Sequence, residues 1–242
     1  MDAIRIEGLT KRYKDVIAVD GLSLTVRQGE LISLLGVNGA GKTTAIKMLS
    51  CLLAPDGGEA WLLGKSVLSE SSEVKSMIAV SPQESATAPG LTVRENLELI
   101  CGVHGFDKAK RESKIAETSS LFGLDEVMGR RAGKLSGGWQ RRLSIAMALI
   151  SEPKILFLDE PTLGLDVIAR SELWSTIRAL KGKVTIILTT HYMEEAEALS
   201  DRIAIMRDGK LLICDTSAEI KRVAEAESFE AAFINIVQGV KK

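Results

Sequence analysis

A glycine-rich segment early in the chain combines residue types that bind phosphate groups. The sequence GVNGAGKTT, residues 36–44, matches the pattern G-x-x-x-x-G-K-[ST], follows the strand-like run LISLLG and precedes a helical pattern. Glycines let backbone N–H groups converge on phosphates, Lys42 brings a cation to the β- and γ-phosphates, and Thr43 can ligate Mg²⁺. The alternative is an ordinary glycine-rich turn beside a solvated lysine. The spacing therefore predicts a nucleotide site formed by Gly36, Asn38, Gly39, Ala40, Gly41, Lys42, Thr43 and Thr44.

Two acidic residues end a strongly apolar run much later in the chain. The sequence KILFLDE, residues 154–160, places Asp159 and Glu160 at the carboxyl edge of a predicted parallel strand, where ligands bind in α/β sheets. We expect Asp159 to hold Mg²⁺ and Glu160 to take a proton from an attacking water. His191 ends the run VTIILTT and is expected at the same edge. Two such acids often only cap a turn, and a lone histidine is more often structural, so both assignments depend on the phosphate site.

The stretch LSGGWQRRLSIAMALI, which begins at Leu135, contains a second candidate anion site. Ser136, Gly137 and Gly138 present backbone N–H groups at an expected helix start, an arrangement that favours anions. The sequence therefore predicts one complete phosphate cradle and a second one without an evident ligand of its own.

The composition is typical of a soluble globular protein. Of the 242 residues, 45% are apolar and 26% are charged. The apolar runs are too short to cross a bilayer and the first residues lack a signal-peptide pattern, so a cytoplasmic location is expected. A net charge of −1 offers no general attraction to nucleic acid, which is not expected as a partner. Three widely separated cysteines without metal-ligand spacing are expected to be buried, reduced thiols: Cys51, Cys101 and Cys214.

Alternating strand-like and helical segments predict an α/β fold that positions the candidate residues. A helix is expected over residues 42–53, and SMIAVSP reads as a buried strand. KILFLDE and VTIILTT flank the helical pattern ARSELWSTIRAL, which indicates strand, crossover helix and strand. Asp208-Gly209 between two strand-like runs predicts a β-hairpin, and the residues after Asp215 alternate as in an amphipathic helix.

No repeat or linker divides the chain, so a single domain over residues 1–242 is expected. Residues 1–84 and 153–216 are expected to form a nucleotide-binding core. Residues 85–152 are expected to form a helical lobe, and residues 217–242 a helical tail.

In their order along the chain, these motifs resemble those of the nucleotide-binding subunit of ATP-binding cassette (ABC) transporters. The resemblance covers nearly the whole chain and rests on GVNGAGKTT, SPQE around Gln83, LSGGWQRR, ILFLDEPT, LGLD ending at Asp166, and His191. The segments GLTVRENLEL, TTHYMEEAEALSDRIAIM and ESFEAAFI further resemble ATPase subunits of bacterial drug, sodium and polysaccharide exporters. The resemblance implies a P-loop NTPase, RecA-like core with a mixed or parallel sheet, an N-terminal antiparallel β part and an inserted helical subdomain.

The resemblance assigns roles that the residues alone leave open. It implies that Tyr13 stacks on adenine, although a half-exposed strand tyrosine is the alternative. Gln83 would reach the metal and the attacking water and would join the core to the helical lobe. Lys42, Gln83, Glu160 and His191 would form the catalytic set, while Thr43, Gln83 and Asp159 would hold the metal. Asp166 would lie at a contact between two subunits, but it could equally cap the following helix.

The resemblance also accounts for the second cradle. In a head-to-tail pair of subunits, Ser136, Gly137 and Gly138 of one chain would contact the γ-phosphate at Lys42 of the other. A homodimer or a dimer with a similar ATPase subunit is therefore expected.

Trp139 departs from the commonest family form, which has glutamine there. We expect it to pack inside the helical lobe, because it shares one helix stripe with Leu143, Ala146, Met147 and Ile150.

The expected function is that of an ATPase subunit that binds ATP and Mg²⁺ and drives a separate integral membrane permease, for export. Such a subunit would lie peripherally on the cytoplasmic face of the membrane. One alternative is a soluble ABC ATPase acting in translation or DNA maintenance, but such proteins usually carry two cassettes or a long coiled-coil insertion. Another is a small-molecule P-loop kinase, which would leave LSGG unexplained.

Overall fold

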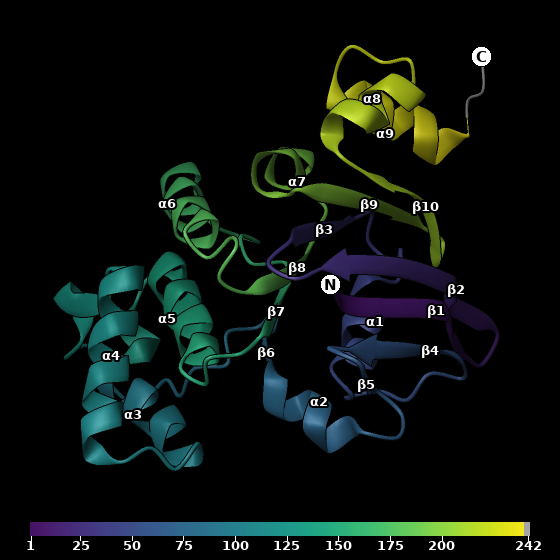
Figure 1. The fold of residues 1–242 in the computed structure, drawn as a ribbon. Coiled ribbons are helices and arrows are strands. Elements are labelled where there is room, and N and C mark those ends of the chain that lie inside the picture. The colour runs from purple at the N-terminus through teal and green to yellow at the C-terminus, as the bar shows by residue number, and fades with distance from the viewer. Residues whose placement is uncertain (240–242) are drawn as a thin grey trace.

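The computed structural model describes residues 1–239 and contains two β-sheets with helices packed around them (Figure 1). The larger sheet has the strand order β10-β9-β3-β8-β7-β6. Strands β6 to β9 run parallel to β3, and β10 is antiparallel to β9. The bounds are β3 Leu31–Leu35, β6 Ile78–Ser81, β7 Ile155–Asp159, β8 Thr185–Thr190, β9 Arg202–Arg207 and β10 Lys210–Asp215. All residues of β3, β7 and β8 are buried, as expected of central strands covered on both faces.

The smaller sheet is antiparallel, with the order β2-β1-β4-β5. Its strands are β1 Asp2–Tyr13, β2 Val16–Arg27, β4 Gly57–Leu62 and β5 Lys65–Ser66. Apolar residues of both sheets pack with helix α1 (Lys42–Leu49) and with Val74 of α2 (Ser71–Met77) in one buried cluster. The mixed larger sheet and the antiparallel N-terminal part confirm the predicted fold class.

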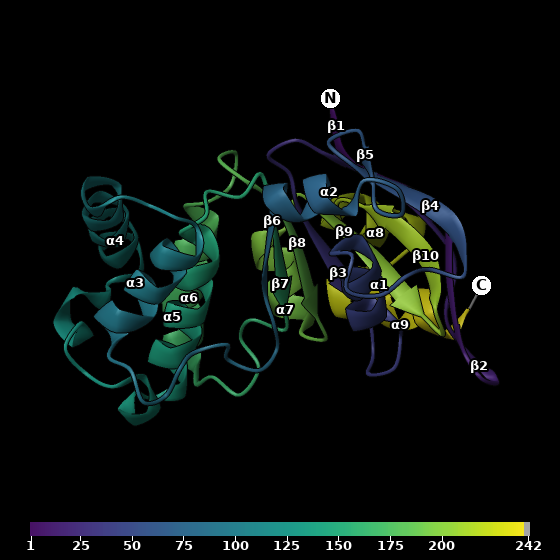
Figure 2. The ribbon, with the colours of Figure 1, turned by 90° about the horizontal axis from the view of Figure 1, so that it is seen from below.

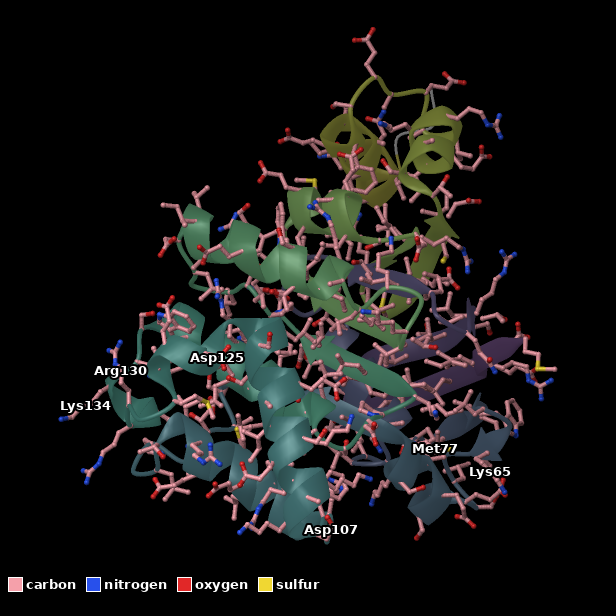
Figure 3. All side chains as sticks on the ribbon, turned by 60° about the vertical axis from the view of Figure 1, so that its left-hand side comes forward. Lys65, Met77, Asp107, Asp125, Arg130 and Lys134 are labelled. Atoms are coloured by element: carbon pink, nitrogen blue, oxygen red, sulfur yellow. The ribbon has the colours of Figure 1, made fainter. Side chains whose placement is uncertain are left out.

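Three helices form a lobe at the β6 side of the larger sheet (Figures 1 and 2). They are α3 Val93–Val103, α4 Lys108–Phe122 and α5 Gly137–Leu149, with 3₁₀ turns η1 Leu124–Val127 and η2 Ala132–Lys134 between α4 and α5. Local sequence sets their ends: Thr92 and Glu95 form a capping box, and Asp107 caps α4. Asp107 lies at one extremity of the lobe, and Arg130 and Lys134 extend outward ahead of α5 (Figure 3).

Helices α6 and α7 follow β7 and β8, and two short helices follow β10. Their bounds are α6 Val167–Arg178, α7 Met193–Leu199, α8 Ser217–Val223 and α9 Phe229–Gln238. The pattern after Asp215 suggested one amphipathic helix, but Glu225 adopts φ 48° and Ser228 caps a new helix, so the segment is split. None of the helices within residues 1–239 is long and apolar enough to cross a bilayer.

Two local expectations need correction. The helix expected over residues 42–53 ends at Leu49, because Cys51 turns into the left-handed region at φ 57°. Cys101 is buried, but Cys51 and Cys214 are only partly buried. Burial nevertheless raises the pKa of the Cys214 thiol to about 11.

The hairpin at Asp208-Gly209 is confirmed: both residues have positive φ and join β9 to β10.

Candidate functional site

The glycine-rich loop joins β3 to α1, and its backbone lies against neighbouring strands. A Cβ on Gly36 would lie 2.4 Å from the carbonyl oxygen of Met206, and one on Gly41 would lie 2.3 Å from that of Ala18. Gly41 also has φ 98°, which a residue with a side chain rarely adopts. These two positions therefore require glycine. Helix α1 begins at this loop, so its first backbone N–H groups, which have no partner within the helix, can bind an anion there.

Lys42 is the first residue of α1 and lies folded over this loop. Its ammonium donates to the carbonyl of Gly36 at 2.7 Å and to that of Val37 at 3.3 Å. Its Nζ also lies 3.4 Å from Oε1 of Glu160, and only 6% and 8% of the two side chains are exposed. The ammonium is thus held at the loop by oxygen atoms that anionic phosphate oxygens can replace.

Asp159 ends β7 and Glu160 follows it directly, and both side chains reach residues of this loop and of the start of α1. Oδ1 of Asp159 accepts hydrogen bonds from the hydroxyl of Thr43 at 3.2 Å and from that of Thr189 at 2.5 Å. Glu160 has φ 50°, an uncommon backbone conformation that turns its carboxylate toward the loop. Nδ1 of His191 lies 2.7 Å from Oε2 of Glu160, so a proton on Nδ1 is donated to this carboxylate.

The sequence did not single out Thr189, although it links both acids. Its hydroxyl donates to Asp159 and accepts from the backbone N–H of Glu160 at 3.0 Å. The available sequence signal is the pair Thr189-Thr190, two polar residues at the end of an apolar run. Thr189 therefore fixes the orientation of both carboxyl-bearing residues from β8.

A cavity of about 710 Å³ lies over the glycine-rich loop. Most of the residues expected to bind nucleotide or catalyse its hydrolysis line it: Tyr13, Asn38, Gly39, Ala40, Gly41, Lys42, Thr43, Thr44, Gln83, Glu160 and His191. Tyr13 is 46% exposed at the end of β1, so it is both a half-exposed strand tyrosine and part of the wall. The sequence did not identify five further wall residues, which are Val16, Ile17, Ala18, Leu163 and Asp208.

Six expected site residues do not line this cavity: Gly36 and Asp159, which are buried, and Ser136, Gly137, Gly138 and Asp166. Ser136 is the exposed N-cap residue of α5, followed by exposed Gly137 and half-buried Gly138. Asp166 caps α6, accepting from the backbone N–H groups of Ile168 and Ala169, both at 2.9 Å. The capping role left open for Asp166 is therefore present, while the contacts of the three α5 residues and of Asp166 with a second subunit stay predictions.

Trp139 packs within the helical lobe, as its stripe predicted. It lies against the apolar cluster that contains Leu143 and Ile150, and the guanidinium of Arg142 is 4.9 Å from its ring. Such a contact adds to the packing of the ring.

A fully buried glutamate lies behind the site. Oε1 of Glu195 accepts from the hydroxyl of Thr162 at 2.8 Å and from the indole N–H of Trp174 at 3.0 Å, while Oε2 has no hydrogen-bond partner within residues 1–239. Burial raises the pKa of Glu195, and these hydrogen bonds offset part of that rise. The carboxyl group thus joins α7 to the β7–α6 loop and to α6.

Glu195→Gln is expected to change how stability depends on pH. The folded protein holds the proton of the Glu195 carboxyl group more tightly than the unfolded chain does. This proton therefore stabilises the folded state fully below the unfolded pKa of about 4.3, and the stabilisation is lost as the pH rises through the folded pKa. Glutamine has no such loss. The Tm of the variant relative to the parent should therefore rise as the pH increases above the unfolded pKa, by roughly 3–5 °C for each unit by which folding raises the pKa. A parallel pH dependence in parent and variant would contradict this, and Glu126→Gln on the exposed η1 turn is the control.

Comparisons with known proteins agree with the nucleotide site that this geometry indicates. Residues 19–163 match the ABC transporter family. The daunorubicin/doxorubicin resistance ATP-binding protein DrrA of Streptomyces peucetius is 43% identical over 220 residues, which are 90% of this chain and 67% of that protein. The Nod factor export ATP-binding protein I of Burkholderia orbicola is 42% identical over 209 residues, covering 86% of this chain and 68% of that protein.

A solved structure agrees with these relatives. The dimeric ATP-binding cassette MJ0796, bound to ADP and Pi in a post-hydrolysis state, superposes with a TM-score of 0.79 at 25% identity, covering 88% of this chain and 98% of that one. The phosphate loop, the acids at the end of β7 and the histidine after β8 lie together in this chain, as binding and hydrolysis of ATP require. The chain therefore belongs to the ABC transporter family, as an ATP-binding subunit that hydrolyses ATP.

Proposed function

We propose that this chain hydrolyses Mg²⁺-ATP to drive export through a separate integral membrane permease. The observation that carries the proposal is the convergence of Lys42, Asp159, Glu160 and His191 on one phosphate loop. Export is supported by relatives named for drug resistance and for Nod factor export. In this proposal the chain is cytoplasmic and lies peripherally on the cytoplasmic face of the membrane.

The residues at the loop suit a magnesium ion bound together with ATP. The hydroxyl of Thr43 and the carboxylate of Asp159 already lie 3.2 Å apart, and Gln83 lines the same cavity. Magnesium prefers such oxygen ligands, few of them from the protein and the rest from phosphates and water. When bound, the ion would neutralise charge on the β- and γ-phosphates.

The remaining residues are assigned to proton transfer and orientation. Glu160 would accept the proton of the attacking water, and its carboxylate is held between Lys42 and His191. His191 would keep that carboxylate in place through Nδ1. Lys42 and the backbone N–H groups of the loop would stabilise the negative charge of the transferring phosphoryl group. Tyr13 would contact the base from the rim of the cavity.

Two copies, or one copy and a similar ATPase subunit, would complete each site. The N-terminus of α5 is exposed and does not line the cavity of its own chain. In a head-to-tail dimer, Ser136, Gly137 and Gly138 would contact the γ-phosphate bound to the partner, and Asp166 would lie near the same contact. A helix N-terminus favours such an anion.

Ser136→Ala tests the contribution of one subunit to the site of the other. The variant should bind ATP as a monomer with near-normal affinity, because Ser136 lies outside the cavity of its own chain. Loss of a donor to the transition state should lower kcat by roughly tenfold or more. Fluorescent-nucleotide titration and steady-state ATPase assays measure both quantities. Loss of ATP binding by the monomer would contradict the assignment across subunits.

The proposed transport function is tested by the membrane partner. The chain should copurify with an integral membrane protein, and its ATPase activity should change when that protein is present in vesicles. Copurification with ribosomes or DNA, and release of phosphate to a small-molecule acceptor in place of water, would each contradict the proposal.

A further inference from the structure

Arg141 is a buried cation whose guanidinium binds backbone carbonyl groups on two parts of the site. It lies on α5, five residues after Ser136, and is 5% exposed. Nη1 donates to the carbonyl of Pro82 at 2.6 Å, and Nη2 donates to that of Gln83 at 2.5 Å. Nη2 also reaches the carbonyl of Glu160 at 3.4 Å. The same side chain therefore holds the backbone of Gln83 and touches that of Glu160.

The contacts of Arg141 differ from those of an ordinary structural arginine. Within residues 1–239 no carboxylate hydrogen-bonds to its guanidinium, and its only acceptors are these carbonyl groups. Burying an arginine without a carboxylate partner is unfavourable unless its donors are satisfied by well-placed acceptors. Burial lowers the pKa of Arg141 from its ordinary value, while the nearby charges of Asp159 and Glu195 oppose this. The backbone of residues 82–83 must therefore stay in one conformation for the cation to remain satisfied.

We infer that Arg141 is a positioning residue, which fixes Gln83 relative to Glu160 and links both to the N-terminus of α5. Helix α5 contacts β6 and β7, the strands that precede Gln83 and Glu160 (Figure 1). A second, weaker link joins α5 to β6 through the hydroxyls of Ser144 and Ser81, 3.2 Å apart. Among the side chains of residues 1–239, Arg141 alone forms hydrogen bonds to the backbone after both strands. The inference rests on the proposed roles of Gln83 at the metal and of Glu160 as the base.

The chemistry of the side chain makes the role specific to arginine. The planar guanidinium presents a fixed fork of donors, so it can bind the successive carbonyls of Pro82 and Gln83 while one nitrogen reaches Glu160. The ammonium of lysine is a single point of charge and cannot hold the three oxygen atoms in this arrangement. A displaced Gln83 would misplace the ion and the attacking water, and a shift of about 1 Å can lower a rate a hundredfold.

Arg141→Lys is the direct test, in steady-state ATPase assays with Mg²⁺ titration. We expect kcat to fall roughly tenfold to a hundredfold, with the KM for ATP changed less than about threefold. The Mg²⁺ concentration for half-maximal turnover should rise, as it should in Gln83→Ala. Arg94→Lys is the matched control, because this arginine of the same lobe pairs only with the surface carboxylates of Glu98 and Glu112 and should leave all three quantities unchanged.

A double-mutant cycle separates positioning from a general packing effect. If Arg141 acts through Gln83, combining Arg141→Lys with Gln83→Ala should lower kcat by less than about twofold beyond the worse single variant. Multiplied effects, unchanged turnover in Arg141→Lys, or a lowered Tm without a change in Mg²⁺ dependence would each overturn the inference. Arg141→Gln provides a second variant should the lysine not fold. Wild-type turnover in Gln83→Ala and Glu160→Gln would instead refute the proposed site roles.

Discussion

Glu160→Gln is expected to bind ATP with near-parental affinity and to lose almost all hydrolysis. Glutamine keeps the size of the side chain but cannot accept the proton of the attacking water. Removing a general base costs roughly a hundredfold to ten-thousandfold in rate, and kcat should fall within that range. In the proposed dimer the γ-phosphate is contacted by both subunits, so a variant that cannot hydrolyse ATP should also accumulate as an ATP-bound dimer, visible by size-exclusion chromatography with light scattering.

The control for this variant is the same substitution at an exposed acid. Glu126→Gln in the η1 turn removes a charge far from the phosphate loop and should change neither turnover nor oligomeric state. Unchanged hydrolysis in Glu160→Gln would remove this residue as the base. A full loss of ATP binding would indicate that the ion pair with Lys42 is needed to build the loop itself.

Lys42→Ala is expected to weaken ATP binding directly. The ammonium is the one side-chain cation of α1 that faces the loop, and a charge-assisted hydrogen bond contributes about 1.5–3 kcal/mol. The Kd for ATP should therefore rise roughly tenfold to more than a hundredfold. AMP lacks the β- and γ-phosphates, so its affinity should change much less. Isothermal titration with both nucleotides measures the difference.

Lys47→Ala provides the matched control on the same helix. Lys47 is exposed near the end of α1, and its loss should leave both affinities unchanged. Normal ATP affinity in Lys42→Ala would contradict the assignment of the whole loop. Equal losses for ATP and AMP would instead show that removal of the buried cation has disturbed the fold beside Glu160.

The parts of the site that depend on local pattern were predictable from the sequence. The apolar runs that precede Lys42, Glu160 and His191 required buried parallel strands, whose carboxyl ends meet at one edge. Those strands and the fold class are confirmed. The roles of the residues, and the division at residues 84/85 and 152/153, stay predictions.

Contacts between distant segments were not predictable in this way. Thr189 contacts the carboxylate of Asp159 on another strand, and Arg141 contacts carbonyl groups of the residues that follow β6 and β7. Neither residue type indicates such a partner in its local sequence. The end of α1 was also missed, because nothing in the sequence near Cys51 marks a left-handed turn. Sequence spacing predicts which residues share a strand or helix, while the pairing of remote backbone groups depends on how the elements pack.

The strand order of the larger sheet bears on how the protein is made. Strand β3, near residue 31, lies between β8 and β9, which are synthesised more than 150 residues later. A ribosome adds about 5–20 residues each second, so the apolar segment 31–35 waits on the order of ten seconds for both neighbours. Such distant pairings slow folding and leave apolar surface open to aggregation. We therefore expect β3 to be the strand most exposed to aggregation while the rest of the chain is still being synthesised.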